Sequence, residues 1–247
     1  MSISEKLDTI AENVSKVHNA GKRAEYDAFW DGFQQNGRAT DYSSSFSRNR
    51  FNDATLRPKY DIKPINCNYM FAYNGYNAED KNFITDIAEC FEKAGIVFDT
   101  SSCTNFGYMF YVATEVTRIP EINVESCTHL EAFFTNCHKL KTIDCLTLRK
   151  DGTNTWTTDI WGAPFQACNA LANIKIEGTI GMSISFQHSP LTATSIVSII
   201  EHLSDTASGM NVTFKRSAVN TADWHTTNYA SWDDLVAIKP NWTISLV

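Results

Sequence analysis

Apolar residues return at fixed intervals between about residue 100 and residue 175 of the chain. Cys127 follows Cys103 at the same interval at which Ile143 follows Ile119. This interval lies within the roughly 20 to 29 residues of a leucine-rich-type repeat, whose units bury their apolar faces by stacking on one another. The pattern therefore predicts a solenoid of stacked repeat units.

Within each unit the apolar positions are regularly spaced, every third residue. The same order of side chains occurs twice, as Phe134, Cys137, Leu140, Ile143 and as Phe165, Cys168, Leu171, Ile174. The short alternating runs around them predict six strands, at 96–100, 121–124, 145–148, 173–177, 183–187 and 212–215. The expected fold class is α+β: a leucine-rich-repeat solenoid, with a β-strand plus a loop or short helix in each unit, an N-terminal helical segment and helical caps.

One unit is longer than its neighbours. The step from Ile143 to Ile174 is longer than the step from Ile119 to Ile143, and the excess lies at 149–155, a run with Gly and Asn that predicts a projecting loop. An aromatic side chain with polar neighbours on such a loop is typical of a sugar or protein anchor. The candidate ligand-binding residues are Asn154, Trp156 and Trp161. For both tryptophans the alternative is a place in the core of the unit, and for Trp161 this alternative is the favoured one.

The start of the chain carries a heptad pattern. Its apolar residues are spaced alternately by four and three, as in the seam of a coiled coil, and the candidate oligomerisation residues are Ile3, Leu7, Ile10, Val14 and Val17. An isolated helix of this length is marginal in water, so the seam needs a partner. Two alternatives remain open: a hairpin with the following helix through Tyr26, Phe29, Trp30 and Phe33, or a parallel coiled coil between copies, a trimer being compatible with Ile and Val at the core positions.

The rest of the chain divides into further segments. Residues 1–36 are expected to form a helical segment for oligomerisation or attachment. The next segment, residues 37–64, is rich in serine and contains Pro58 and Pro64, which predicts an extended arm or linker. The predicted solenoid spans 65–189 and includes a capping helix at 80–94. Residues 190–247 form a C-terminal capping unit that begins with an amphipathic helix after a polar N-cap.

Two stretches resemble known protein families. The run from Phe134 to Ile143 closely resembles the BspA-type leucine-rich repeats of bacterial surface and phage proteins, and the run from Phe165 to Ile174 resembles them with Ala in place of the usual Gly. Residues 22–37 and 58–64 are similar to a pattern of phage and prophage tail-region proteins from Firmicutes. The first resemblance implies the solenoid, and the second implies a component of a virion.

Composition narrows the classes of function. The formal net charge is −7, and phosphate binding requires clustered Lys and Arg, so no nucleic-acid partner is expected. The start of the chain lacks the pattern of a signal peptide, and no apolar run is long enough to span a membrane, so no membrane insertion is expected. The seven cysteines show no C-x-x-C pair, which favours buried thiols over disulfides or a metal site.

No catalytic motif stands out among the six histidines and the carboxylate pairs, so no enzyme activity, cofactor or metal is expected. The expected function is a non-enzymatic structural or adhesion protein of a bacteriophage or prophage virion, in a tail or surface appendage. Its expected partners are other virion proteins or a host cell-surface glycan or protein, and a homo-oligomer is expected. The alternative is a bacterial cell-surface protein that mediates host or carbohydrate interaction; a carbohydrate-active enzyme ranks third.

Overall fold

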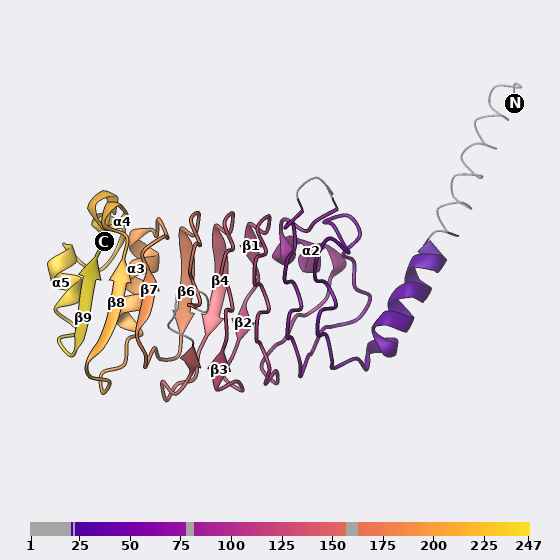
Figure 1. Cartoon of the computed structure of the whole chain (residues 1–247), viewed down its shortest axis with the longest axis horizontal. Helices are drawn as coiled ribbons and strands as arrows, with labels where there is room; N and C mark the ends of the chain where they lie inside the picture. Colours follow the sequence, from indigo (N-terminus) through magenta and orange to yellow (C-terminus); the bar gives the residue numbers. More distant parts are fainter. Residues whose placement is uncertain (1–20, 22, 78–81, 157–162) are drawn as a thin grey trace, which may run out of the picture.

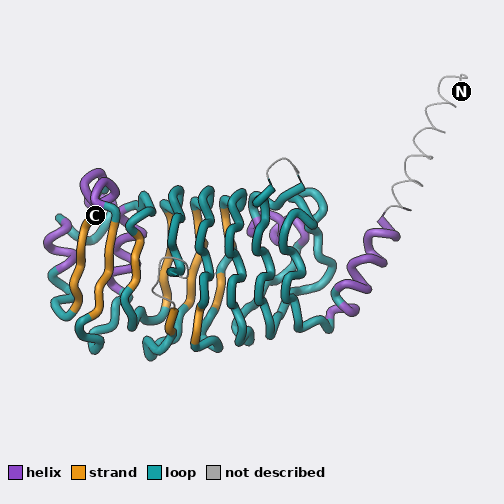
Figure 2. Tube along the Cα trace, viewed as in Figure 1, coloured by secondary structure: helices purple, strands orange, loops and turns teal. Residues whose placement is uncertain are grey.

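The computed structural model describes residues 21, 23–77, 82–156 and 163–247. The molecule is elongated, and successive stretches of chain lie side by side along its long axis, from the N-terminal helix at one end to β9 at the other (Figure 1). Turns and loops make up most of each stretch (Figure 2). Besides a helix at 23–33, the elements are η1 (Gln35–Gly37), α2 (Ile87–Ala94), β1 (Arg118–Ile119), β2 (Ile122–Asn123), β3 (His129–Leu130), β4 (Thr142–Thr147), β5 (Thr155–Trp156), β6 (Asn173–Glu177), β7 (Ile184–Phe186), α3 (Ala193–Glu201), β8 (Met210–Phe214), α4 (Arg216–Thr221), η2 (Trp224–Thr226), α5 (Trp232–Val236) and β9 (Trp242–Leu246).

The named strands form three small sheets, and every pairing is parallel. In the first sheet β1 and β2 both pair with β4, and β6 pairs with β4 as well. The second sheet is the pair β3 and β5, and the third has the order β7, β8, β9. Outside the named strands, parallel contact continues as single bridges, such as Ile62 with Phe98 and Asn66 with Asn105.

The prediction of a leucine-rich-repeat solenoid is wrong. The structure is α+β with small parallel sheets, and no closed sheet or regular strand-per-unit solenoid is formed by the described residues. Strand positions nevertheless lie close to those expected: β6 covers the predicted 173–177, whereas the predicted 96–100 holds only the bridge at Phe98. Strand length varies: β1 has two residues, whereas β4 has six and β8 has five.

Two serine side chains end the first sheet at β6. The main-chain N–H groups of Ile174 and Ile176 face away from β4, and they donate to Ser195 Oγ (2.9 Å) and Ser198 Oγ (2.8 Å). Both serines belong to α3, whose N-cap Thr192 accepts from the main-chain N–H of Ser195, as the polar N-cap in the sequence predicts. Helix α3 thus satisfies the donors of β6 that a further strand would otherwise bind.

A column of aromatic rings runs through the interior, from turns of the earlier layers to β7 and β8. The centroids of Phe71 and Phe110 are 5.4 Å apart, and those of Phe134 and Phe165 are 5.3 Å apart. The column continues at similar separations through Phe186 and Phe214. Side chains of this size dominate the energetics of a protein core, so the column holds the elongated molecule together along its length.

Each aromatic of the column from Phe46 to Phe165 sits in the same kind of turn. The residue two positions after the aromatic has a positive φ in every case, at Arg48, Tyr73, Val112, Asn136 and Ala167. The turns are joined by main-chain hydrogen bonds: Phe71 N donates to Met109 O (2.8 Å), and Asn136 N donates to Gln166 O (2.8 Å). The repeat in the sequence therefore encodes a stacked turn as well as a buried face.

Residues 37–64 do not form the extended arm predicted from their serine and proline content. Tyr42, Phe46, Leu56 and Ile62 are each 0–1% exposed, and Phe46 N donates to Met70 O (2.8 Å). The polar residues between these buried side chains lie on the outside, and they gave the segment the composition of a linker. It is instead the first layer of the stack.

The N-terminal helix at 23–33 packs on this first layer. The Trp30 side chain is fully buried, with its ring 5.5 Å from Phe51 and 6.3 Å from Phe46. The helix ends at Phe33, shortly before the end predicted at Asn36 and Gly37, and the backbone already has a positive φ at Gln35. The five predicted oligomerisation residues lie outside the described residues, so hairpin and coiled coil both stay predictions. The capping helix predicted at 80–94 is shorter than expected: it is α2, which begins after the N-cap Asp86.

All seven cysteines are buried free thiols. Cys137 Sγ lies 3.0 Å from Phe110 O, and Cys168 Sγ lies 3.2 Å from Phe134 O, so equivalent thiols bind equivalent carbonyls in successive layers. Burial raises the pKa of Cys168 to about 12.

Cys168 in the native protein is therefore expected to resist alkylation. Since the thiolate is the nucleophile, a pKa raised from 9 to about 12 lowers the thiolate fraction about 1,000-fold, and reaction with iodoacetamide at mildly alkaline pH slows accordingly. Peptide mass spectrometry after timed alkylation measures the rate, with the protein in concentrated urea as the control. Equal rates in native and unfolded protein would contradict the burial of this thiol.

Candidate functional site

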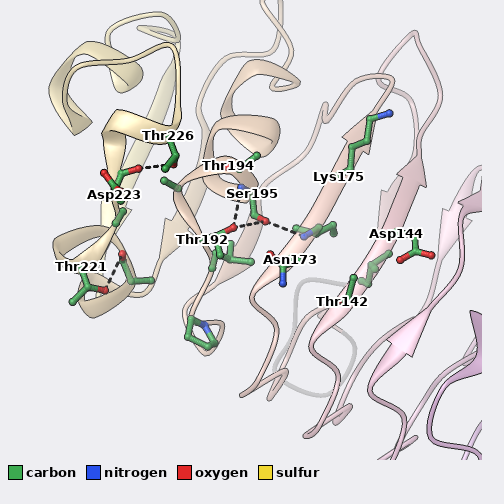
Figure 3. A pocket seen from close by; sticks show the side chains of 17 residues that line it. Thr142, Asp144, Asn173, Lys175, Thr192, Thr194, Ser195, Thr221, Asp223 and Thr226 are labelled. Atoms are coloured by element: carbon green, nitrogen blue, oxygen red, sulfur yellow. Dashed lines mark hydrogen bonds between the residues drawn. The ribbon is translucent and has the colours of Figure 1, made fainter.

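A polar groove opens between β4, β6, the start of α3 and the segment from α4 to η2 (Figure 3). Its volume is about 940 Å³. The groove is open to solvent, and threonine is its commonest polar side chain, followed by aspartate. Those with labels in Figure 3 are Thr142, Asp144, Asn173, Lys175, Thr192, Thr194, Ser195, Thr221, Asp223 and Thr226.

Two of the charged side chains at the wall of the groove, Asp144 and Lys175, are paired with residues of opposite charge. The Arg118 guanidinium donates to both carboxylate oxygens of Asp144, at 2.9 and 2.8 Å, and to Glu92 at 3.1 Å. The hydrogen bond to Asp144 is the main cause of a raised pKa for Arg118. Lys175 contacts Glu177, which raises the pKa of the lysine and lowers that of the glutamate. These two ion pairs therefore add local polarity to the wall of the groove.

Several hydroxyl groups of the groove bind the main chain. Ser195 Oγ accepts from Ile174 N and donates to Ala172 O (3.0 Å). Thr226 Oγ1 donates to Asp223 O (2.7 Å), and the Asp223 carboxylate accepts from the main-chain N–H of His225. None of these contacts pairs a hydroxyl with a histidine or carboxylate side chain, the pairing that activates a nucleophile. The arrangement fits a surface that holds a ligand by hydrogen bonds.

The structure corrects the ligand-binding prediction at Asn154 and Trp156, which are 2% and 4% exposed. The Asn154 amide donates to Cys127 O (2.7 Å) and its carbonyl accepts from Arg149 N (2.6 Å). Trp156 Nε1 donates to Ser183 O (2.7 Å). Both side chains bind the protein itself, so the inserted loop is tied inward. Trp161 lies outside the described residues.

Sequence reasoning missed the groove, because its walls come from segments as far apart in the sequence as Thr142 and Thr226. The one local signal was the polar run at 190–195, interpreted only as the start of a helix. Among the described residues there is no cluster of three or more His, Cys, Asp or Glu that could hold a metal ion. Within the same ranges, no helix has both the length and the apolar character needed to cross a membrane.

Comparison with protein-family models, with curated proteins and with solved structures finds no match to this chain. The resemblances to BspA-type repeats and to phage tail-region proteins therefore stay predictions.

Proposed function

We propose that this chain is a non-enzymatic structural and adhesion protein of a bacteriophage or prophage virion. One end of the molecule attaches it to other virion proteins, and the groove near the other end contacts the host cell surface. The resemblance of residues 22–37 and 58–64 to phage tail-region proteins supports the first part of the proposal.

The arrangement of the two ends is the observation that carries the proposal. The helix at 23–33 lies at one end of the stack, whereas β6 and α3 lie toward the opposite end (Figure 1) and line the groove. The aromatic column and the parallel main-chain hydrogen bonds between layers make the body between them stiff. An appendage needs this separation between its attachment point and its binding surface.

The virion part is tested by induction of the source bacterium and purification of the released particles. Mass spectrometry of the purified particles is expected to detect the chain at a fixed ratio to the major tail proteins. Particles that form without the chain, with the chain left soluble in the lysate, would contradict the proposal.

The groove part is tested by Thr194→Arg. Thr194 is an exposed side chain of the groove in α3, so the larger and charged arginine fills the groove without entering the core. Binding of the fluorescently labelled full chain to cells of the source bacterium is expected to weaken at least about tenfold, which corresponds to about 1.4 kcal/mol. Flow cytometry over a range of protein concentrations gives the apparent affinity.

Thr243→Arg is the matched control, because Thr243 is also exposed but lies on β9, away from the groove. It is expected to bind cells like the unchanged chain. If Thr194→Arg and Thr243→Arg bind equally well, the groove is not the adhesion surface.

A further inference from the structure

Five tyrosines gather on the turns of two neighbouring layers, in a part of the molecule separate from the groove. We call this set the tyrosine surface; its members are Tyr69, Tyr73, Tyr76, Tyr108 and Tyr111. The rings of Tyr69 and Tyr108 are parallel within 2° and their centroids are 4.7 Å apart. Tyr73 meets Tyr111 edge to face at 5.6 Å and Tyr76 edge to face at 6.0 Å. Each ring therefore fixes the orientation of the next.

The fold does not require tyrosine at these positions. Tyr69, Tyr73 and Tyr108 have φ angles of 54°, 58° and 56°, a region that costs an L-residue other than Gly or Asn about 1–2 kcal/mol. At the equivalent positions of other layers, Ser44 and Ala132 stand in place of Tyr69 and Tyr108, and Arg48, Val112, Asn136 and Ala167 stand in place of Tyr73. Because the same turns form without aromatic side chains, the rings kept at these strained positions indicate a role beyond folding.

The surface is exposed and carries polar groups. Tyr76 is 70% exposed, while the other four tyrosines are half-buried. The Tyr108 hydroxyl donates to Glu131 Oε1 (2.6 Å), which raises the pKa of Tyr108 to about 12 and keeps the phenol neutral. The Arg48 guanidinium lies 5.7 Å from the centre of the Tyr73 ring.

A pocket adjoins this surface. Its volume is about 410 Å³, and its walls are Arg48, Asn49, Tyr73, Tyr76 and Asn77. The pocket is open to solvent, so a ligand would lie against its wall and would not be enclosed. Asn49 is held rigidly, since its amide donates to Asn77 O (2.9 Å) and its carbonyl accepts from Gly75 N (2.8 Å). This part of the wall is thus held in place by hydrogen bonds within the protein.

We propose that the tyrosine surface and its pocket bind a glycan. A sugar ring has an apolar face of C–H groups, which packs on an aromatic ring, and a rim of hydroxyls, which bind guanidinium and amide groups. The pocket offers both kinds of contact within one small volume. A nucleic acid is disfavoured by the net charge of −7, and a protein partner would need a larger apolar area than these few rings provide.

Only the source of the glycan, the surface of the host cell, rests on the proposed function. The binding itself rests on the tyrosine surface alone. It would be a second contact on the flank of the molecule, in addition to the groove.

Glycan binding by the full chain is measured by saturation-transfer NMR and by titration with three defined probes. These are the β1,4-linked tetrasaccharides of N-acetylglucosamine and of glucose, and the α1,4-linked tetrasaccharide of galacturonic acid. At least one is expected to bind. Tyr76→Ala removes the most exposed ring and is expected to weaken that binding about tenfold. Arg48→Asn removes the guanidinium, and its asparagine tolerates the positive φ at this position. It is expected to weaken binding of the galacturonic acid probe more than binding of the other two.

Tyr229→Ala is the matched control, because Tyr229 is a half-buried tyrosine near the C-terminal end, far along the chain from the tyrosine surface. It is expected to bind like the unchanged chain. The proposal is overturned if none of the three probes binds, or if Tyr76→Ala and Tyr229→Ala bind equally well while circular dichroism shows both to be folded. Glycan binding by a chain that is missing from purified particles would overturn the proposed function and leave the glycan site standing. A chain that is present in the particles but binds none of the probes would overturn the glycan site and leave the proposed function standing.

Discussion

Replacement of Gly178 by alanine is expected to lower the free energy of unfolding by about 2–5 kcal/mol. Gly178 follows β6 with a φ of +81°, and a Cβ added there would lie 2.1 Å from the carbonyl oxygen of Leu148. This oxygen belongs to the main chain of the neighbouring layer, so it cannot move aside as a flexible side chain would. The variant adds a left-handed alanine and a steric overlap, and one of the two layers must shift.

Urea unfolding followed by circular dichroism measures the effect, and Gly95→Ala separates its two causes. Gly95 also has a positive φ, of +66°, but a Cβ added there would meet no atom within 4 Å. Its expected cost is therefore that of the left-handed backbone alone, about 1–2 kcal/mol. Equal losses for Gly178→Ala and Gly95→Ala would show that the layers at residues 148 and 178 are not in close contact.

Phe134→Ala is expected to lower the free energy of unfolding by about 3–5 kcal/mol, the usual cost of deleting a buried phenylalanine. The ring is fully buried at the middle of the aromatic column, 5.4 Å from Phe110 and 5.3 Å from Phe165. Its loss leaves a cavity between rings whose turns are fixed by main-chain hydrogen bonds, so the walls can collapse only in part.

The same urea titration measures this variant, with Phe29→Ala as the control. Phe29 is 48% exposed on the N-terminal helix, so its replacement removes a ring of equal size and leaves a smaller cavity. The expected loss for Phe29→Ala is below about 1.5 kcal/mol. A cost at Phe134 no larger than the cost at Phe29 would mean that the aromatic column does not stabilise the stack.

The sequence alone was informative about the buried face. The apolar residues spaced by three, from Phe134 to Ile143 and from Phe165 to Ile174, are all buried. A face of this kind follows from local chain geometry, since the same spacing in successive units places the same side chain in the same direction. The strand β6 lies at its predicted place because its alternating pattern is also local. The N-cap of α3 at Thr192 fits the polar N-cap that the sequence predicts.

The division into sheets could not be derived from the sequence. The periodic pattern predicts that strands recur, but which strand stays paired depends on what lies beside it in space. At β6 the partners are Ser195 and Ser198, two ordinary helix residues in the sequence that become acceptors for strand donors in the fold. The predicted solenoid was wrong because it assumed that every strand would be followed by another.

For the candidate functional surfaces, too, the sequence determines one part and the tertiary structure decides the other. The sequence by itself determined which residue types the chain can offer: a run of threonines and serines near residue 192, and tyrosines at 69, 73, 108 and 111. Only the tertiary structure decided that Asn154 and Trp156 point inward, and that residues from 142 to 226 line one groove. The physical reason is that burial and proximity depend on contacts between layers, whereas periodicity reports only the direction of each side chain within its own layer.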